Sequence, residues 1–191
     1  MRTGQDKARR GRWRPLRART AAVTVAVLTL AGCGTKAGYG AATPPSPMSI
    51  SSEAFIQGAL AQPYTCHGAK VNPPLTWSGA PPGTKSVALI VDDSSAPITP
   101  YIYWLVFDIN PDTTDIQEGS LPTGARQAQN SKGTADYEAP CPSGHAHSYR
   151  FTIYALSRVL DLPNGAPLLS VWTAIAAATI GRGRIVVTGH Q

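Results

Sequence analysis

Near its N-terminus the sequence lacks an apolar run long enough to cross a membrane. The uncharged run Ala21–Leu30 has ten residues, whereas a membrane-spanning helix needs about 20. The first twenty residues carry eight basic side chains and a single acid, Asp6. A basic segment, a short apolar segment and then small residues are typical of a secretory signal peptide. The beginning of the chain therefore predicts export and not a membrane span.

Cysteine is scarce, with three in the whole chain. The first of them ends the segment Leu30-Ala31-Gly32-Cys33, which resembles the bacterial lipobox. This resemblance implies that residues 1–32 are a lipoprotein signal peptide. Cys33 would then carry diacylglycerol and palmitate-type chains on the extracytoplasmic face of the cell membrane. The alternative is an ordinary signal peptide that a cysteine follows by chance, and the choice between Sec and twin-arginine export stays open.

The positive charge of the chain is concentrated in this signal. The whole sequence has 17 basic and 11 acidic residues, a formal charge of +6. Removal of residues 1–32 takes away eight basic residues and one acid, which leaves nine against ten and a formal charge of −1. The charge therefore gives no reason to expect a nucleic-acid partner.

The remaining chain divides into a short linker and one domain. Residues 33–48 are rich in glycine, alanine and proline and have no periodic pattern, which predicts a flexible tether. Such a coil reaches roughly 20 Å on average. Residues 49–191 have the length of one ordinary domain with its own core.

This domain shows no internal repeat, and its pattern is one of short strands between proline and glycine turns. Only Leu168–Thr179 has helical spacing, and Gly181 is expected to end that helix. The pattern predicts a mainly β fold, an antiparallel β-sandwich with a few short helices, one of them near the C-terminus. The expected strands are Leu75–Ser78, Ser86–Val91, Tyr101–Ile109, Tyr149–Leu156 and Ile185–Thr188.

A candidate pocket lies where the loop Tyr137–Gly144 leads into a strand. With a period of two, one face of that strand carries two imidazoles and a phenol and then becomes apolar; its residues are His145, His147, Tyr149, Phe151 and Ile153. A second polar segment, Asp92–Pro97, follows the buried strand Ser86–Val91. It is either a turn whose carboxylates bond local N–H groups or one wall of a pocket.

Metal binding and catalysis are two further interpretations of these residues. His145 and His147 could chelate a metal together with His67, Asp92 or Asp93, but no spacing brings these residues together. A hydrolase could use His147 as a general base that Asp93 orients. The sequence lacks a nucleophile motif such as G-x-S-x-G, so we expect no catalytic residue. Because no spacing brings the possible ligands together, we also expect no metal site.

Several short motifs in this order resemble the phosphatidylethanolamine-binding protein family, in its bacterial Raf-kinase-inhibitor-like branch. They are Y-T-C-x-G from Tyr64, P-P-L-x-W from Pro73, D-x-x-A-P from Asp93, Y-x-x-P-C-P-x-G from Tyr137 and H-x-Y from His147. The resemblance covers residues 52–185. It implies two antiparallel sheets with a small pocket at one end that takes a phosphate or a phospholipid headgroup.

Carried over by position, the resemblance predicts a ligand pocket made of five residues: Asp93, Ser95, Tyr103, His147 and Tyr149. Three positions depart from the family pattern. Ser95 replaces a second acid, Tyr103 replaces a histidine, and Ser148 replaces an arginine. Because charge-assisted hydrogen bonds hold phosphate most strongly, the loss of two basic side chains predicts weaker binding than in members with the full set.

Cys66 and Cys141 remain once Cys33 is assigned to lipid, and the resemblance places both in loops beside the pocket. In an oxidising compartment we expect them to form a disulfide, the alternative being two free thiols. Taken together, the sequence predicts a lipid-anchored, non-catalytic protein that binds a small anion or a phospholipid headgroup without a cofactor. An interaction module that inhibits a protease or another enzyme is the second hypothesis, and a hydrolase using His147 is the third.

Overall fold

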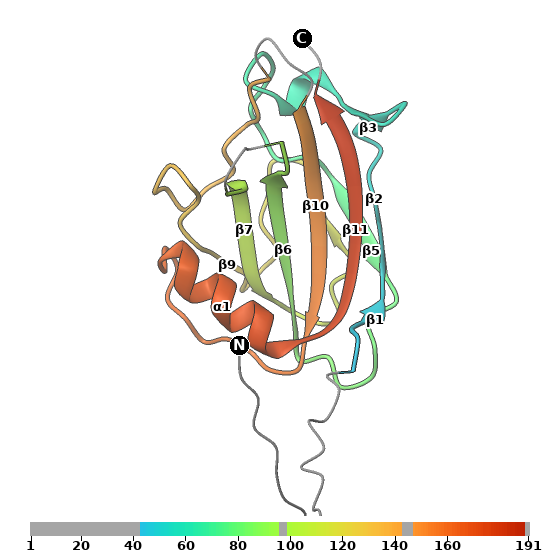
Figure 1. Cartoon of the computed structure of the whole chain (residues 1–191), viewed down its shortest axis with the longest axis vertical. Coiled ribbons are helices and arrows are strands. Elements are labelled where there is room, and N and C mark those ends of the chain that lie inside the picture. The colour runs from blue at the N-terminus through green and yellow to red at the C-terminus, as the bar shows by residue number, and fades with distance from the viewer. Residues whose placement is uncertain (1–42, 96–98, 143–146, 190–191) are drawn as a thin grey trace, which may run out of the picture. The chain divides into compact units, whose positions relative to one another are not determined.

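The residues that the structure describes form two sheets and one α-helix (Figure 1). The computed structural model describes residues 43–95, 99–142 and 147–189. In chain order the elements are β1 (Ser46–Pro47), β2 (Ser49–Ser51), β3 (Phe55–Ile56), β4 (Ala59–Leu60), the 3₁₀ turn η1 (Gln62–Tyr64), β5 (Leu75–Ser78), β6 (Ser86–Asp93), β7 (Tyr101–Ile109), β8 (Asp115–Ile116), β9 (Arg126–Gln127), β10 (His147–Leu156), α1 (Leu168–Ala178) and β11 (Thr179–Gly189).

The central strand β6 is buried along its whole length, as its continuous apolar sequence predicts. Its side chains alternate between two apolar clusters. Val87, Leu89 and Val91 belong to an inner cluster that also contains Leu75 and Trp77 of the smaller sheet. On the other face, the residues of the large sheet pack against α1 in an outer cluster that includes Ala88, Ile90, Leu105, Phe107, Val171 and Ile175. Full burial of a Leu, Val or Phe side chain contributes about 1.5–3 kcal/mol, so these clusters stabilise the fold on both sides of β6.

The large sheet is mixed and curled, not a regular antiparallel sandwich. It follows the order β3-β4-β11-β10-β6-β7-β9, and β2, β5 and β8 form the second sheet. The long central strands pair antiparallel, but β1 and β4 both pair parallel with β11. The prediction of a mainly β fold with a C-terminal helix is confirmed, whereas that of an antiparallel β-sandwich is not. The reason is that two short N-terminal strands complete the edge of β11 in the parallel direction.

The C-terminal helix passes directly into the last strand. α1 ends at Ala178, and Thr179 already has an extended backbone with φ −66° and ψ 123°. The prediction that Gly181 ends the helix is therefore wrong, because Gly181 lies inside β11. A Cβ atom there would come within 2.7 Å of Pro81 Cδ. Gly181 permits this close packing between β11 and the turn before β6.

The N-terminal segment joins the fold earlier than the composition suggests. Ser46 and Pro47 pair with Gly181 and Arg182, and the Met48 N–H donates to the Arg182 carbonyl at 3.0 Å. The last three residues of the predicted tether are therefore part of the domain. Cys33 and residues 1–32 lie outside the described residues. Within the described ranges, no helix is long and apolar enough to cross a membrane.

Candidate functional site

The candidate site lies where β6 ends and β10 begins. Tyr149 pairs with Asp93 across the two strands, and His147, two residues before Tyr149, lies on the same face. His147 Nδ1 lies 2.6 Å from Asp93 Oδ2. Because a carboxylate only accepts hydrogen bonds, Nδ1 is the donor and Nε2 is left for another partner. The Asp93 side chain is 6% exposed and that of His147 is 27% exposed, so the imidazole stands between the core and solvent.

Hydrogen bonds close a turn after β6 and tie this segment to β10. The Ser95 N–H donates to Asp93 Oδ1 at 2.7 Å, and the Ser148 N–H donates to Ser95 Oγ at 2.9 Å. The Ser94 N–H donates to the Ser148 carbonyl, also at 2.9 Å. Asp93 thus makes the local turn contact that one interpretation of this segment predicts, and it also fixes His147. Ser95 acts here as a link between the two strand ends.

Asp92 lies on the opposite face of the sheet from Asp93. Its carboxylate accepts from Arg150 Nε at 2.8 Å and from Arg150 Nη2, and this bond raises the pKa of the arginine. Neighbouring residues of a strand point to opposite faces, so the pair Asp92–Arg150 is separated from the pair Asp93–Tyr149. Asp92 therefore does not belong to the candidate site.

A β-bulge brings Tyr103 to the site. Val91 pairs with Trp104 and Asp92 pairs with Ile102, which leaves Tyr103 as the extra residue of β7. At a bulge the alternation of side chains is interrupted. Trp104 and Tyr103 consequently both pack against the inner cluster. The Tyr103 ring meets the Tyr149 ring edge to face, with 5.6 Å between centroids.

Tyr149 is the most enclosed residue of the site. It is fully buried, and its hydroxyl is the buried side-chain polar atom without a hydrogen-bond partner among the described residues. Its ring lies nearly parallel to that of His147, with 6.0 Å between centroids. Burial, with smaller contributions from Tyr103 and Asp93, raises the pKa of Tyr149 well above its usual value. Burial and the nearby Asp93 also raise the pKa of Tyr103, to about 12. Both phenols are therefore neutral hydrogen-bond donors near neutral pH.

The structure thus brings together all five residues that the sequence predicts for the pocket: Asp93, Ser95, Tyr103, His147 and Tyr149. It adds Tyr137, whose hydroxyl donates to the Tyr64 carbonyl at 2.8 Å and whose ring meets Trp104 edge to face. Burial raises the pKa of Tyr137, and Tyr149 and Tyr103 add to this effect. Tyr137 begins the motif Y-x-x-P-C-P, which is the signal that could have identified it.

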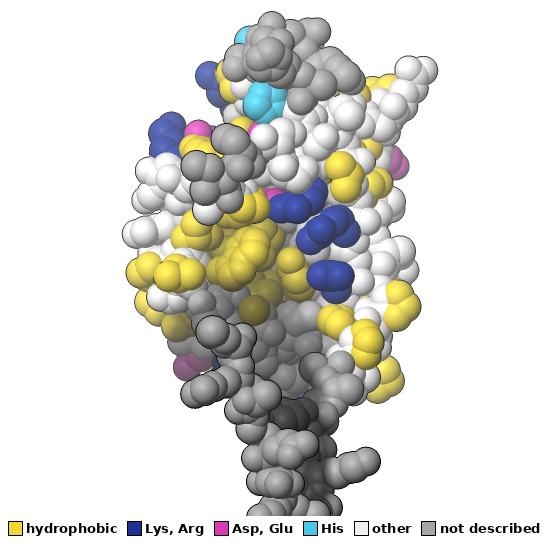
Figure 2. All heavy atoms as spheres, viewed as in Figure 1, with side chains coloured by type: hydrophobic (Ala, Val, Ile, Leu, Met, Phe, Trp, Pro, Cys, Tyr) yellow, Lys and Arg dark blue, Asp and Glu magenta, His cyan; other side chains and the backbone are white. Residues whose placement is uncertain are grey.

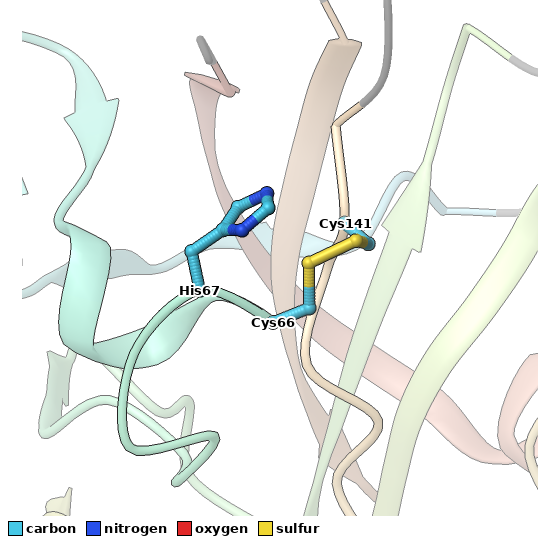
Figure 3. A group of neighbouring side chains, drawn as sticks. All are labelled: Cys66, His67 and Cys141. Atoms are coloured by element: carbon cyan, nitrogen blue, oxygen red, sulfur yellow. A yellow bond between two sulfur atoms is a disulfide. The ribbon is translucent and has the colours of Figure 1, made fainter.

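The two loops beside the site are joined by the Cys66–Cys141 disulfide, as the sequence predicts. The Cys66 N–H also donates to the Pro140 carbonyl at 2.9 Å. Figure 3 shows the bonded sulfur atoms and the imidazole of His67 beside them. The ligating atoms of Cys66, Cys141 and His67 lie within 4.8 Å of one another. Because the sulfur atoms are bonded to each other, neither is a thiolate that could bind a metal.

The metal ligands considered from the sequence do not meet at one place in the described part of the chain. Asp92 faces away from Asp93, His67 lies at the disulfide, and His145 falls outside the described residues. A cavity of about 360 Å³ lies beside the disulfide and contains both Lys70 and Lys132 in its wall, together with Cys66, Thr134, Asp136, Tyr137, Glu138, Ala139 and Cys141. These two lysines therefore mark the same end of the domain as the candidate site.

Comparison with known proteins agrees with the motifs. A family model described as phosphatidylethanolamine-binding protein matches residues 50–190. A UPF0098 protein of Methanothermobacter thermautotrophicus is 39% identical over 145 residues, which cover 73% of this chain and 96% of the relative. A protein of Mycobacterium tuberculosis named putative lipoprotein LppC is 37% identical over 182 residues, 85% of this chain and 90% of the relative.

Two solved structures have the same fold. A putative phosphatidylethanolamine-binding protein homologue of Chlamydia trachomatis has a TM-score of 0.69 and 30% identity, and the match covers 76% of this chain and 99% of that one. The YbcL protein of Escherichia coli, described as a member of the mammalian PEBP family, has a TM-score of 0.70 and 27% identity. That match covers 75% of this chain and 98% of the YbcL chain.

Removal of the disulfide should lower the stability of the domain without unfolding it. The sequence separation is 75 residues, for which the chain-entropy model gives about 4 kcal/mol. The double variant Cys66→Ser, Cys141→Ser should lose up to this amount in urea unfolding, while the hydrogen bond from the Cys66 position to Pro140 keeps the loops together. Wild type treated with a dithiol reductant is the matched control. Equal midpoints for oxidised wild type and the double variant would show that the bond contributes nothing.

Proposed function

Because the chain belongs to the phosphatidylethanolamine-binding protein family, we propose that it is an exported, lipid-anchored binding protein whose pocket takes a small anion. The ligand class is a phosphate or the phosphorylated headgroup of a lipid. His147, Tyr149 and Tyr103 donate hydrogen bonds to it, and Asp93 and Ser95 position these donors. The protein carries out binding without a catalytic step.

The observation that carries this proposal is the buried hydroxyl of Tyr149. A buried donor without an acceptor costs about 1–3 kcal/mol, and the described residues offer this hydroxyl none. An anion oxygen that reaches the end of the inner cluster would accept this hydrogen bond. Tyr103, beside Tyr149, has a raised pKa and would supply a second neutral donor. The unpartnered Tyr149 hydroxyl thus supports the proposal that the ligand accepts hydrogen bonds.

The contact between His147 and Asp93 supports binding that depends on pH. With Nδ1 donating to Asp93, a neutral imidazole presents only the lone pair of Nε2, which repels an anion oxygen. Protonation turns Nε2 into a charged donor, and charge-assisted hydrogen bonds are about twice as strong as neutral ones. Asp93 compensates this charge on the inner side, so the protonated imidazole can remain in place. Acidification should therefore strengthen binding.

The two serines that follow Asp93 make hydrogen bonds to β10 and none to His147 among the described contacts. Ser94 Oγ donates to the Ser148 carbonyl at 3.0 Å, and Ser95 Oγ accepts from the Ser148 N–H. Ser94 Oγ thus gives its proton to the backbone of β10, and Ser95 Oγ accepts from that backbone. The described contacts therefore favour a binding role for His147 and Asp93 over a serine-based hydrolase.

Calorimetric titration with inorganic phosphate and with phosphoethanolamine tests the pocket. We expect weak binding of both that is tighter near pH 5.5 than near pH 7.5, because protonation turns His147 Nε2 into a charged hydrogen-bond donor. His147→Gln should remove the pH dependence, and Tyr103→His should tighten binding. Thr173→Ser, an exposed change on α1, is the control. Heat that is absent at both pH values in wild type would reject the pocket and favour the interaction-module hypothesis.

Cell fractionation tests the lipid anchor. The proposal draws on the segment Leu30–Cys33 and on the 37% identical relative named as a putative lipoprotein. Two acyl chains suffice for lasting attachment, whereas one is marginal. Cys33→Ser should therefore move the protein from the membrane fraction to the soluble extracytoplasmic fraction, and Cys33 of wild type should show the mass of the lipid. A variant that stays with the membrane after a carbonate wash would contradict the anchor.

A further inference from the structure

Four exposed basic side chains lie near the end of the domain where the N-terminal segment joins the fold. Lys85 precedes β6, Arg158 follows β10, and Arg182 and Arg184 lie on β11. All four are exposed, and among the residues that the structure describes none of them forms an ion pair with an acid. We refer to this set as the basic end.

Hydrogen bonds fix the backbone at two residues of the basic end, Lys85 and Arg158. The Lys85 N–H donates to the Leu156 carbonyl at 2.8 Å, and Ser86 Oγ donates to the Arg158 carbonyl at 2.7 Å. Both residues are thereby fixed where β6 begins and β10 ends. Main-chain pairing thus holds Lys85, and a bond from the Ser86 side chain holds the bend that carries Arg158.

β11 connects these residues to β1. Ser46 and Pro47 of β1 pair with Gly181 and Arg182. Arg184 follows Arg182 on the same face at the period of two, and it donates to Thr152 Oγ1 at 2.9 Å. Figure 2 shows basic side chains grouped over β10 and β11, beside an apolar surface. The N-terminal segment therefore enters the fold directly at the basic end.

The charge of the domain is unevenly distributed. Arg126 lies at the same end of the domain as the four residues of the basic end. Three acidic residues also lie at this end of the domain: Asp108 and Asp161, which contact Arg126, and the exposed Asp112 in the turn after β7. This end of the domain therefore carries five basic and three acidic residues. The rest of the described chain has three basic and seven acidic residues. The end that receives the tether is positive although the whole domain is not.

We propose that the basic end rests on the anionic phospholipid headgroups of the membrane that holds the anchor. The inference rests on the proposed lipid attachment at Cys33. Twelve residues separate Cys33 from Ser46, and a coil of this length reaches about 20 Å on average. The tether thus keeps the basic end close to the surface at a high effective concentration. Each basic side chain near an anionic bilayer strengthens attachment about fivefold.

This orientation directs the pocket away from the membrane. Arg182 pairs with Tyr154, which lies seven positions after His147 on β10. At about 3.3 Å per residue this places His147 roughly 23 Å further along the strand. Figure 1 shows β1 at one end of the large sheet and the start of β10 at the other. The anion therefore reaches the pocket from the medium and not from the leaflet that holds the anchor.

Amine labelling of the full mature protein on vesicles tests the orientation. The acylated protein is reconstituted in vesicles of phosphatidylcholine, alone or with phosphatidylglycerol, and acetylation of each lysine is followed by mass spectrometry. On anionic vesicles Lys85 should react at least about threefold more slowly, since the headgroups cover the basic end. Lys70 and Lys132 line the cavity at the opposite end and should react at unchanged rates.

Substitutions separate this surface from the pocket. Changing Arg158, Arg182 and Arg184 to Ser should remove the protection of Lys85 and leave phosphate calorimetry unchanged, whereas Lys70→Ser with Lys132→Ser should leave the protection intact. If wild type carries no lipid, coupling Cys33, the cysteine outside the disulfide, to a maleimide lipid tests the surface by itself. Equal labelling of Lys85 on both vesicle types, or protection of Lys70 and Lys132 instead, would overturn the proposal.

Discussion

The antiparallel pairing of β6 with β10 determines what the side chains at the end of both strands can do. Tyr149 lies opposite Asp93, and Arg150 lies opposite Asp92. Alternation sends the first pair toward the inner cluster and the second pair toward the other face. A slip of one residue that placed Arg150 opposite Asp93 would turn the arginine toward the core. The apolar residues further along both strands prevent this slip, since they too would change faces.

The same register leaves a buried hydroxyl without a partner. Most buried polar groups in proteins are hydrogen-bonded, and Tyr149 is an exception at the end of a well-packed cluster. Its ring is fully buried and lies between the rings of Tyr103 and His147, which restrict its movement. A binding group fixed in this way loses little conformational entropy when a ligand arrives. Local destabilisation and readiness for binding thus have one structural cause.

Much of this arrangement could be predicted from the sequence, because it follows from alternation and from motif residues. Ser86 and Tyr101 begin their strands where the apolar patterns predict, and the motif segments bring Asp93 and His147 together. The bulge at Tyr103 could not be predicted, since a single extra residue leaves no mark in the apolar pattern. The pairing of Ser46 with Gly181 was hidden for another reason. Main-chain hydrogen bonds form this strand pairing, and the segment around Ser46 has the composition of a linker.

Replacement of Tyr149 by Phe measures the central claim most directly. The change removes one oxygen and keeps the ring, so it deletes a buried donor without opening a large cavity. In the absence of ligand the free energy of unfolding should stay equal or rise by about 1 kcal/mol, because the unpartnered group is gone. The shift in Tm that phosphate gives the wild type should disappear at the same time. A variant that is clearly less stable and still responds fully to phosphate would contradict the account.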